Sequence, residues 1–311
     1  MADLIAKHGP THALARQFLP DEREWHTLPY ENADPIGDAR FSPVTGVVHR
    51  YPDRVLLKVA HSCPVYCRFC FRREMIGSYG EALQGRELDD ALEYVRIHPE
   101  IWEVILTGGD PLSLSPRRLG GILSQLSAMH HVAVLRIHSR IPIMAPHSID
   151  EDYLHLFADA SVAERFAVYL AVHVNHVEEL TTPVVAVLKQ LAGTGVVLVS
   201  QTVLLRGIND DSAVLEALFR TLVRLKIRPY YLHHPDLAPG TSHFRVPLEQ
   251  GQALMRGLRG KLSGLCLPTY VLDIPGGFGK VPVGPQYAGA RDAAGTRVVL
   301  DPSGQSHIYP E

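Results

Sequence analysis

Three cysteines lie close together in residues 61–74, HSCPVYCRFCFRRE. Cys63, Cys67 and Cys70 have a Cys-x3-Cys-x2-Cys spacing, so one loop could bring three thiolates to a single metal centre. Structural zinc usually takes four protein ligands, and the remaining cysteine, Cys266, is far away in the sequence. Three thiolates fit better with a [4Fe–4S] cluster that leaves one iron open for a small ligand. Incidental buried cysteines, or a zinc site completed by a distant histidine, are the alternatives.

A second motif, in residues 273–286 (DIPGGFGKVPVGPQ), places Lys280 after three glycines. Glycine has no side-chain bulk and tolerates positive φ, so this lysine could approach a bound planar cofactor closely. A P-loop is a poor interpretation, because Val281 and Pro282 follow the lysine and disfavour a helix start. A lysine that forms a Schiff base with pyridoxal 5′-phosphate (PLP) is the better functional interpretation, and an exposed turn lysine is the alternative.

The rest of the chain alternates between strand and helix patterns. Short apolar runs rich in β-branched residues predict strands at 54–60, 103–107, 132–138, 166–174, 196–204, 229–232 and 270–273. Helices are predicted at 88–98, 115–129, 150–158, 177–193, 212–226 and 247–260, with Ser115 and Pro116 as an N-cap and first helical residue. The alternation favours parallel strands with right-handed crossovers, and therefore an α/β barrel. A doubly wound open sheet is the alternative, but no GxGxxG follows the first strand.

Polar residues recur at the same end of consecutive predicted strands. They are the cysteine loop, residues 108–110, residues 138–140, His173 with Asn175, Gln201, and His233 with His234 and Asp236. In parallel α/β barrels the C-terminal ends of the strands build the active site. The recurrence therefore predicts one shared site.

Composition restricts the class of protein. The 311 residues suffice for one large core, and 46% hydrophobic with 20% charged residues is typical of a globular protein. A net charge of −3 and a pI near 6.6 give no reason to expect a nucleic-acid partner. The apolar runs are too short to span a bilayer, and the N-terminus lacks a signal-peptide core. Because cysteines that hold an oxygen-sensitive cluster must stay reduced, we expect a soluble cytoplasmic protein.

The longer string in residues 50–74, RYPDRVLLKVAHSCPVYCRFCFRRE, with its CxxxCxFC core, resembles the lysine 2,3-aminomutase family of radical S-adenosylmethionine (SAM) enzymes. PGGFGKVPVGPQY around Lys280 resembles the PLP-lysine segment of the same family, and the resemblance extends from about Asp34 to Tyr287. It implies a [4Fe–4S] cluster on the three loop cysteines, SAM, and PLP on Lys280.

The fold that the resemblance implies is a partial parallel (β/α)6-type radical SAM barrel. We expect an N-terminal helical and irregular wrap at 1–45, the barrel core at 46–265, and a C-terminal PLP-lysine segment with a tail packed on the barrel at 266–311. Residues 285–311 read as a short, glycine-rich tail.

The resemblance also assigns ligand contacts. Basic and phenolic groups suit a phosphate dianion, and the family segment for the PLP phosphate matches Arg50, Tyr51 and Arg54. The SAM contacts match Gly108, Gly109, Asp110, His173 and Gln201. Taken alone, a Gly-Gly-Asp turn or a histidine bonded to backbone would be a structural feature without a ligand.

Substrate choice follows from three charged positions. Arg72 matches the family residue that binds the substrate carboxylate, and Asp236 and Asp273 match the two carboxylates that bind the distant ammonium of lysine. Two anions facing one cation solve the problem of burying its charge. The alternative is that Asp236 caps a turn and Asp273 ends a strand.

The activity implied is that of an isomerase, a lysine 2,3-aminomutase that interconverts L-α-lysine and β-lysine. A 5′-deoxyadenosyl radical formed from SAM would act on the PLP-bound substrate. The alternatives are a radical SAM and PLP aminomutase for another amino acid, such as arginine or glutamate, and a non-catalytic metal-binding protein.

The chain departs from the larger family members in one respect. They carry a C-terminal extension whose cysteines bind zinc between subunits, whereas this chain has no cysteine beyond Cys266. The strings CFRRE and LRIHSRIPI resemble a compact branch that makes β-lysine for modification of elongation factor P. The partners implied are L-lysine, a reductant such as flavodoxin or ferredoxin, and further copies in a homo-oligomer whose arrangement cannot be taken from the larger members.

Overall fold

The computed structural model describes residues 5–6, 9–73, 83–159, 166–293 and 295–310. In this part of the chain a nine-stranded sheet forms, and its strand order is the order of the sequence. Strands β2 to β8 are parallel, and the edge strands β1 and β9 run antiparallel to their neighbours. The strands are β1 (Val47–Tyr51), β2 (Arg54–Ala60), β3 (Glu103–Gly108), β4 (Val134–Ser139), β5 (Ala167–His173), β6 (Val197–Val203), β7 (Arg228–His233), β8 (Thr269–Asp273) and β9 (Lys280–Pro282).

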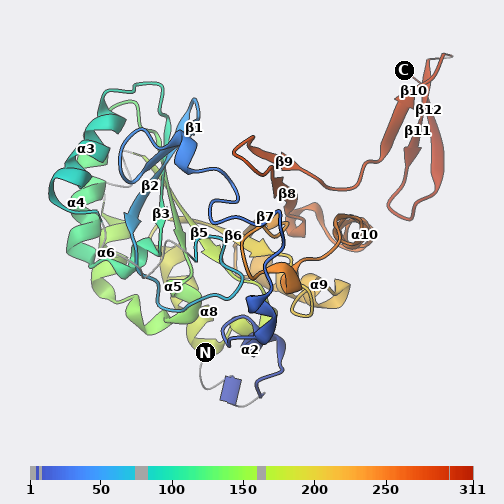
Figure 1. The fold of residues 1–311 in the computed structure, drawn as a ribbon, viewed down its shortest axis with the longest axis horizontal. Coiled ribbons are helices and arrows are strands. Elements are labelled where there is room, and N and C mark those ends of the chain that lie inside the picture. Colours follow the sequence, from blue (N-terminus) through green and yellow to red (C-terminus); the bar gives the residue numbers. More distant parts are fainter. Residues whose placement is uncertain (1–4, 7–8, 74–82, 160–165, 294, 311) are drawn as a thin grey trace.

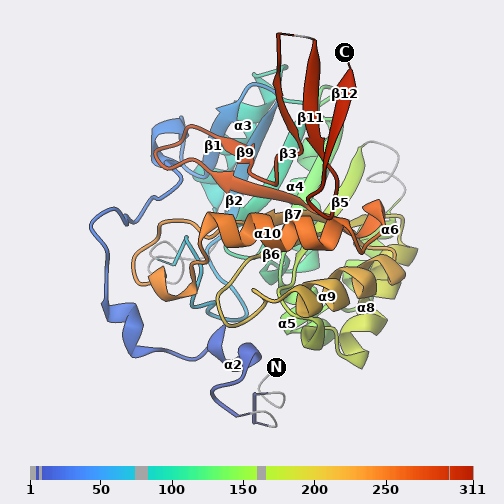
Figure 2. The ribbon, with the colours of Figure 1, turned by 90° about the vertical axis from the view of Figure 1, so that its right-hand side faces the viewer.

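Helices connect the parallel strands and cover the outer face of the curled sheet (Figures 1 and 2). They are α3 (Gly85–Arg96), α4 (Pro116–Ser127), α5 (Ile141–Met144), α6 (Glu151–Ala158), α8 (Thr182–Gly193), α9 (Ser212–Arg224) and α10 (Leu248–Arg259). Each long helix turns one apolar stripe to the sheet; α4 buries Leu119, Ile122, Leu123 and Leu126 at three- and four-residue spacing. The predicted partial (β/α)6-type barrel is confirmed, with β8 as an additional parallel strand.

The predicted elements agree with the observed ones apart from their ends. The Ser115 hydroxyl caps α4 by accepting from the Arg118 amide, as predicted. The predicted helix at 177–193 is wrong in its first turn: Val177–Glu179 is a separate 3-10 turn, and α8 begins at Thr182. Pro183 explains the later start, because proline lacks an amide hydrogen and is favoured in the first turn of a helix.

The N-terminal segment wraps around the C-terminal ends of the strands. It contains the short helix α2 (Ala13–Arg16) and 3-10 turns at Glu22–Trp25 and Ala39–Phe41. Gly37 lies against the loop that precedes β9, where a Cβ would come within 2.7 Å of the Gly276 carbonyl carbon and the Gly277 nitrogen. Arg40 donates to the Gly276 carbonyl at 2.8 Å. The wrap and the glycine loop therefore form one continuous surface.

The C-terminal residues form a second sheet, so the prediction of a plain glycine-rich tail is wrong. β10 (Ala288–Arg291), β11 (Thr296–Leu300) and β12 (Ser306–Pro310) pair antiparallel and project from the barrel (Figure 1). Both connections are turns organised by an aspartate: Asp292 accepts from the Thr296 amide, and Asp301 accepts from the Ser303 and Gln305 amides. Such turns reverse the chain within a few residues.

A membrane-spanning helix is not found in the part of the chain that the structure describes.

The close packing of β3 against the cysteine loop gives a prediction. A Cβ at Gly109 would lie 2.3 Å from the Ser62 carbonyl oxygen, whereas a Cβ at Gly121 on α4 would meet no atom within 4 Å. We expect Gly109→Ala to lower the free energy of unfolding by about 1–3 kcal/mol, because the strand end must move away from the loop. Gly121→Ala, the matched control, should be neutral or stabilising by up to about 1 kcal/mol. Urea denaturation checks both, and equal stabilities of the two variants would contradict the prediction.

Candidate active site

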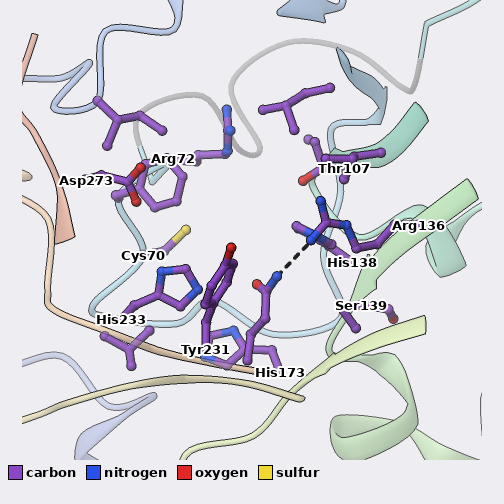
Figure 3. A pocket seen from close by; sticks show the side chains of 18 of the residues that line it. Cys70, Arg72, Thr107, Arg136, His138, Ser139, His173, Tyr231, His233 and Asp273 are labelled. Carbon is purple, nitrogen blue, oxygen red and sulfur yellow. Dashed lines mark hydrogen bonds between the residues drawn. The ribbon is translucent and has the colours of Figure 1, made fainter. Parts of the chain in front are cut away.

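The concave face of the half-barrel encloses a cavity of about 600 Å³ (Figure 3). Its walls come from strands β1 to β9 and from the cysteine loop. Every site residue predicted from the sequence lines it: Arg50, Tyr51, Arg54, Cys63, Cys67, Cys70, Arg72, Gly108, Gly109, Asp110, His173, Gln201, Asp236, Asp273 and Lys280. The expected convergence of strand ends on one site is therefore confirmed as geometry, while the individual ligand roles stay predictions.

Cys63, Cys67 and Cys70 lie in the loop after β2 and are free thiols. Burial, with Asp110 and the neighbouring thiols, raises the pKa of Cys63 to about 12, and burial raises that of Cys70 to about 11. Iron would have to displace these protons. Within the described residues, no three His, Cys, Asp or Glu side chains are arranged to hold a single metal ion. A cluster presents a different iron to each thiolate, so this donor set of three free thiols on one cavity fits it.

The Asp110 side chain is bound within the protein. Its carboxylate accepts hydrogen bonds from the Ser139 hydroxyl and from the amides of Leu112, Arg140 and Ile141, all at 2.6–3.1 Å. These four donors use the lone pairs of both oxygens. The side chain therefore joins the end of β3 to the end of β4, and the contact of Asp110 with SAM stays a prediction.

The histidines in the cavity are neutral. Burial, with the positive charge of Arg140, lowers the pKa of His173 to about 3, and burial lowers the pKa of His138 well below its usual value. The Gln201 amide donates to Nε2 of His138 at 3.1 Å, and Nε2 of His173 donates to the Asn175 side chain at 3.1 Å. This wall of the cavity thus offers polar atoms without net charge.

The two edges of the sheet meet at the predicted PLP site. The backbone amide of Lys280, on β9, donates to the hydroxyl of Tyr51, on β1, at 2.7 Å. The guanidinium of Arg54 lies over the Tyr51 ring, 3.9 Å from its centre. Lysine, phenol and guanidinium groups therefore lie within reach of one small anionic ligand, which is the donor set that a phosphate-bearing aldehyde requires.

Asp38 is a site residue that the sequence did not reveal. It is 3% exposed, and its carboxylate pairs with Arg50 at 3.0 Å and with Arg72 at 2.6 Å. These arginines are the ones predicted for two different anions, so one buried aspartate orients both. Asp38 lies in the irregular N-terminal wrap, where no periodic pattern or motif marks it.

An alkylammonium already occupies the predicted substrate-ammonium site. The Lys280 amine pairs with the Asp273 carboxylate, and Nδ1 of His233 lies 3.3 Å from the same nitrogen. Burial, with the charge of Asp273, raises the pKa of Asp236 to about 7 against the opposing charges of Lys280 and Arg72. The two aspartates are thus close enough to repel each other in the absence of a second cation.

Other cavity residues lacked a predicted role. Arg136, which pairs with Glu103 at 3.0 Å, and Tyr231 face the cavity together with His233 (Figure 3). One signal could have found Arg136: it lies two residues before His138, and alternate residues of a strand share a face. His138, Arg140 and His233 were noted as strand-end polar residues only.

Comparisons with known proteins agree with this geometry. Residues 57–218 match the Radical SAM superfamily, and residues 255–311 match the family described as Lysine-2,3-aminomutase. The L-lysine 2,3-aminomutase of Fusobacterium nucleatum is 40% identical over 91% of this chain and 66% of its own length. The L-lysine 2,3-aminomutase of Clostridium subterminale is 38% identical over 91% of this chain and 67% of its own length. The Glutamate 2,3-aminomutase of Clostridioides difficile is 35% identical over 89% of this chain and 62% of its own length.

This chain thus spans about two thirds of the length of the curated relatives that it matches. Among solved structures, a radical SAM methyltransferase from Sphaerobacter thermophilus superposes with a TM-score of 0.50 at 19% identity, covering 73% of this chain and 68% of that one. This similarity supports the fold alone. The superfamily implies a [4Fe–4S] cluster and SAM, and the lysine 2,3-aminomutases use PLP. On the evidence of the matched segments and of these relatives, the chain belongs to the lysine 2,3-aminomutase family of radical SAM enzymes.

Proposed function

We propose that this protein is an isomerase that interconverts L-α-lysine and β-lysine. One observation carries the proposal: the Lys280 ammonium lies on Asp273, beside Asp236, in the same cavity as the three cysteines. The cavity therefore combines the ligands for a cluster, an amine for PLP and a carboxylate pair that holds an alkylammonium. The relatives named L-lysine 2,3-aminomutase support the same substrate.

Different residues in the cavity bind PLP and SAM. When bound, the cluster with SAM supplies a radical that can remove hydrogen from carbon, and PLP supplies an electron system that can stabilise the resulting unpaired electron. Lys280 holds PLP, and Arg50, Tyr51 and Arg54 bind its phosphate. Gln201 and His173 bind SAM as neutral hydrogen-bonding groups on the opposite wall. The protein contributes mainly position, since reacting groups must be held close and aligned.

Substrate orientation follows from charge at both ends of the cavity. Arg72 binds the substrate carboxylate, and its direction is set by the ion pair with Asp38. Asp236 and Asp273 bind the side-chain ammonium. The Lys280 amine now pairs with Asp273. If this amine held PLP, the Asp273 carboxylate would be free to pair with the substrate ammonium.

Glutamate and arginine are the alternative substrates. A glutamate side chain would bring a third carboxylate toward Asp236 and Asp273, which costs free energy in a buried site. An arginine substrate would also carry a cation at the end of its side chain, so its exclusion depends on the greater length of that side chain. Asp236→Asn and Asp273→Asn should both weaken lysine turnover if these carboxylates bind the lysine ammonium, whereas turnover of a glutamate substrate should not fall, because a repulsive charge is removed.

Water exclusion is the task of the N-terminal wrap. Gly37 packs against the glycine loop before Lys280, and Arg40 donates to that loop. These contacts cover the cavity beside the lysine. A covered site protects reactive intermediates from solvent.

The partners stay predictions. A reductant such as flavodoxin or ferredoxin must supply the electron for the cluster, and the homo-oligomer is untested. The use of β-lysine for elongation factor P rests on the strings CFRRE and LRIHSRIPI. Mass spectrometry of elongation factor P from cells with and without this protein would test that pathway.

The activity itself is tested first. After anaerobic reconstitution with iron, sulfide and PLP, followed by reduction, we expect SAM and L-lysine to yield β-lysine, detected by chromatography. Cys67→Ala and Lys280→Ala should each abolish product, because one removes a cluster ligand and the other the PLP amine. Arg220→Gln is the control, since this arginine pairs with Glu216 on the exposed face of α9. A protein that binds cluster and PLP but leaves lysine unchanged would contradict the substrate assignment.

The pKa of Asp236 predicts a pH dependence. This pKa is raised to about 7, so the carboxylate loses its charge as pH falls through about 7 and regains it above. The dissociation constant of L-lysine should therefore rise below about pH 7, by at most about tenfold per pH unit. Calorimetric titration of the reconstituted enzyme checks this. Asp236→Asn should bind lysine weakly with little pH dependence; an unchanged slope in this variant would show that another group titrates.

The shared aspartate gives a third prediction. Asp38→Asn leaves Arg50 and Arg72 without their buried counter-charge, so the free energy of unfolding should fall by about 3 kcal/mol. Added PLP should restore part of it, because the phosphate supplies negative charge. Asp53→Asn is the matched control: it loses an ion pair with Arg54 whose carboxylate is 56% exposed, and should cost at most about 1 kcal/mol. Denaturation with and without PLP measures both, and equal losses would contradict the role of Asp38.

A further inference from the structure

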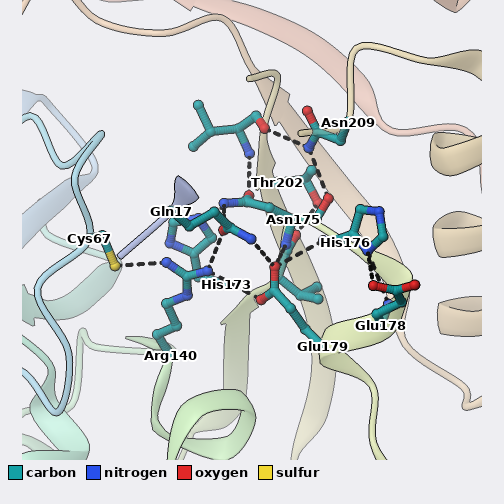
Figure 4. A network of polar contacts seen from close by, with 12 residues as sticks. Gln17, Cys67, Arg140, His173, Asn175, His176, Glu178, Glu179, Thr202 and Asn209 are labelled. Atoms are coloured by element: carbon teal, nitrogen blue, oxygen red, sulfur yellow. Dashed lines mark hydrogen bonds and ion pairs between the residues drawn. The ribbon is translucent and has the colours of Figure 1, made fainter. Parts of the chain in front are cut away.

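A buried arginine touches the sulfur of one cluster cysteine. Arg140 follows β4, is 6% exposed, and donates from Nη1 to Sγ of Cys67 at 2.7 Å (Figure 4). Its guanidinium lies between two aromatic rings, 4.9 Å from the centre of Phe18 and 5.4 Å from that of Phe69. The contact is therefore shielded from water, which strengthens its electrostatic effect.

A network of polar residues holds this arginine in place. Nη2 of Arg140 donates to Gln17 at 2.7 Å and to Glu179 at 3.2 Å. Glu179 is 0% exposed, and its other oxygen accepts from Gln17 and from the amides of Asn175 and His176 (Figure 4). The guanidinium thus has one fixed orientation, and its Nη1 is aimed at the sulfur.

The arginine keeps its charge despite its surroundings. Its guanidinium pairs with the buried carboxylate of Glu179 at 3.2 Å, and arginine side chains stay protonated in proteins. The carbonyl of Gln17 also accepts the amide of Arg68, the residue after Cys67. The network therefore fixes both the cysteine loop and the cation beside it.

We propose that Arg140 sets the reduction potential of the [4Fe–4S] cluster through its charged hydrogen bond to Cys67. The inference rests on the proposed function, because it requires the cluster on the three cysteines. A reduced cluster carries one more negative charge than an oxidised one, so a fixed cation and a hydrogen bond to its sulfur ligand stabilise the reduced form. Arg140 thereby eases the electron uptake that must precede cleavage of SAM, and Glu179 partly offsets its charge.

Two substitutions should shift the potential in opposite directions. Arg140→Gln removes the cation and keeps a hydrogen-bond donor, so the midpoint potential should become more negative. Glu179→Gln removes the compensating anion and keeps Arg140, so the potential should become more positive. A general disturbance of the site would not reverse the sign of the shift between two partners of one ion pair.

The measurement is an EPR-monitored redox titration of the reconstituted protein without SAM, together with iron and sulfide content. Arg68→Gln is the matched control: this arginine neighbours Cys67 in sequence, but its guanidinium pairs with Glu24. The shift in midpoint potential of Arg68→Gln should be smaller than that of Arg140→Gln or of Glu179→Gln. Because Arg140→Gln leaves Glu179 buried and unpaired, the double variant Arg140→Gln with Glu179→Gln removes both charges together and tests the same effect in a neutral network.

The outcomes separate this inference from the proposed function. Full iron content in Arg140→Gln with an unchanged potential would overturn the inference and leave the function intact. An unchanged potential with weakened SAM binding would assign Arg140 to SAM and also overturn it. If the wild-type protein binds iron but neither Arg140 variant does, Arg140 acts in assembly, and the proposed tuning is wrong. If the wild-type protein itself binds no cluster, the proposed function fails, and the inference with it.

Discussion

The hydrogen bond between the Lys280 amide and the Tyr51 hydroxyl joins the first and last strands of the large sheet. Nine strands in sequence order would leave their edges far apart if the sheet were flat. Twist curls the sheet, and this contact fixes how far it curls. The C-terminal strand ends then surround one cavity, and side chains more than 200 residues apart in sequence line it together.

Buried ion pairs line the cavity of this half-barrel, whereas the interior of a closed barrel is packed with apolar side chains. Four arginines that line the cavity have acidic partners. Arg136 pairs with Glu103 and Arg140 with Glu179, whereas Arg50 and Arg72 share Asp38. Such pairs cost more to bury than apolar side chains would. They hold guanidinium groups in fixed directions, as the proposed binding of a phosphate and of carboxylates requires.

The sequence predicts the barrel well because strand and helix periodicity is local. The side chains that line the cavity could be predicted where a motif marks them, as for the cysteine loop and Lys280. Asp38, Gln17 and the contact between Arg140 and Cys67 could not, since each depends on packing between distant segments that no local pattern encodes. The C-terminal strands were missed because each is five residues or shorter, and glycines in their turns suggested an irregular tail. The internal hydrogen bonds of the Asp110 carboxylate were also not predicted, because they join residues from two different strand ends.

The N-terminal wrap has a consequence for the order of folding. Gln17 bonds Glu179, 162 residues later, and Arg40 bonds Gly276, 236 residues later. During synthesis the first forty residues therefore emerge long before the surfaces that they will cover. The barrel therefore forms first, with its cavity uncovered. The wrap docks afterwards, because closing so long a loop stabilises nothing until both contacting segments exist. The cysteine loop, in which Arg68 bonds Gln17 and Glu24 of the wrap, lacks these contacts until the wrap docks.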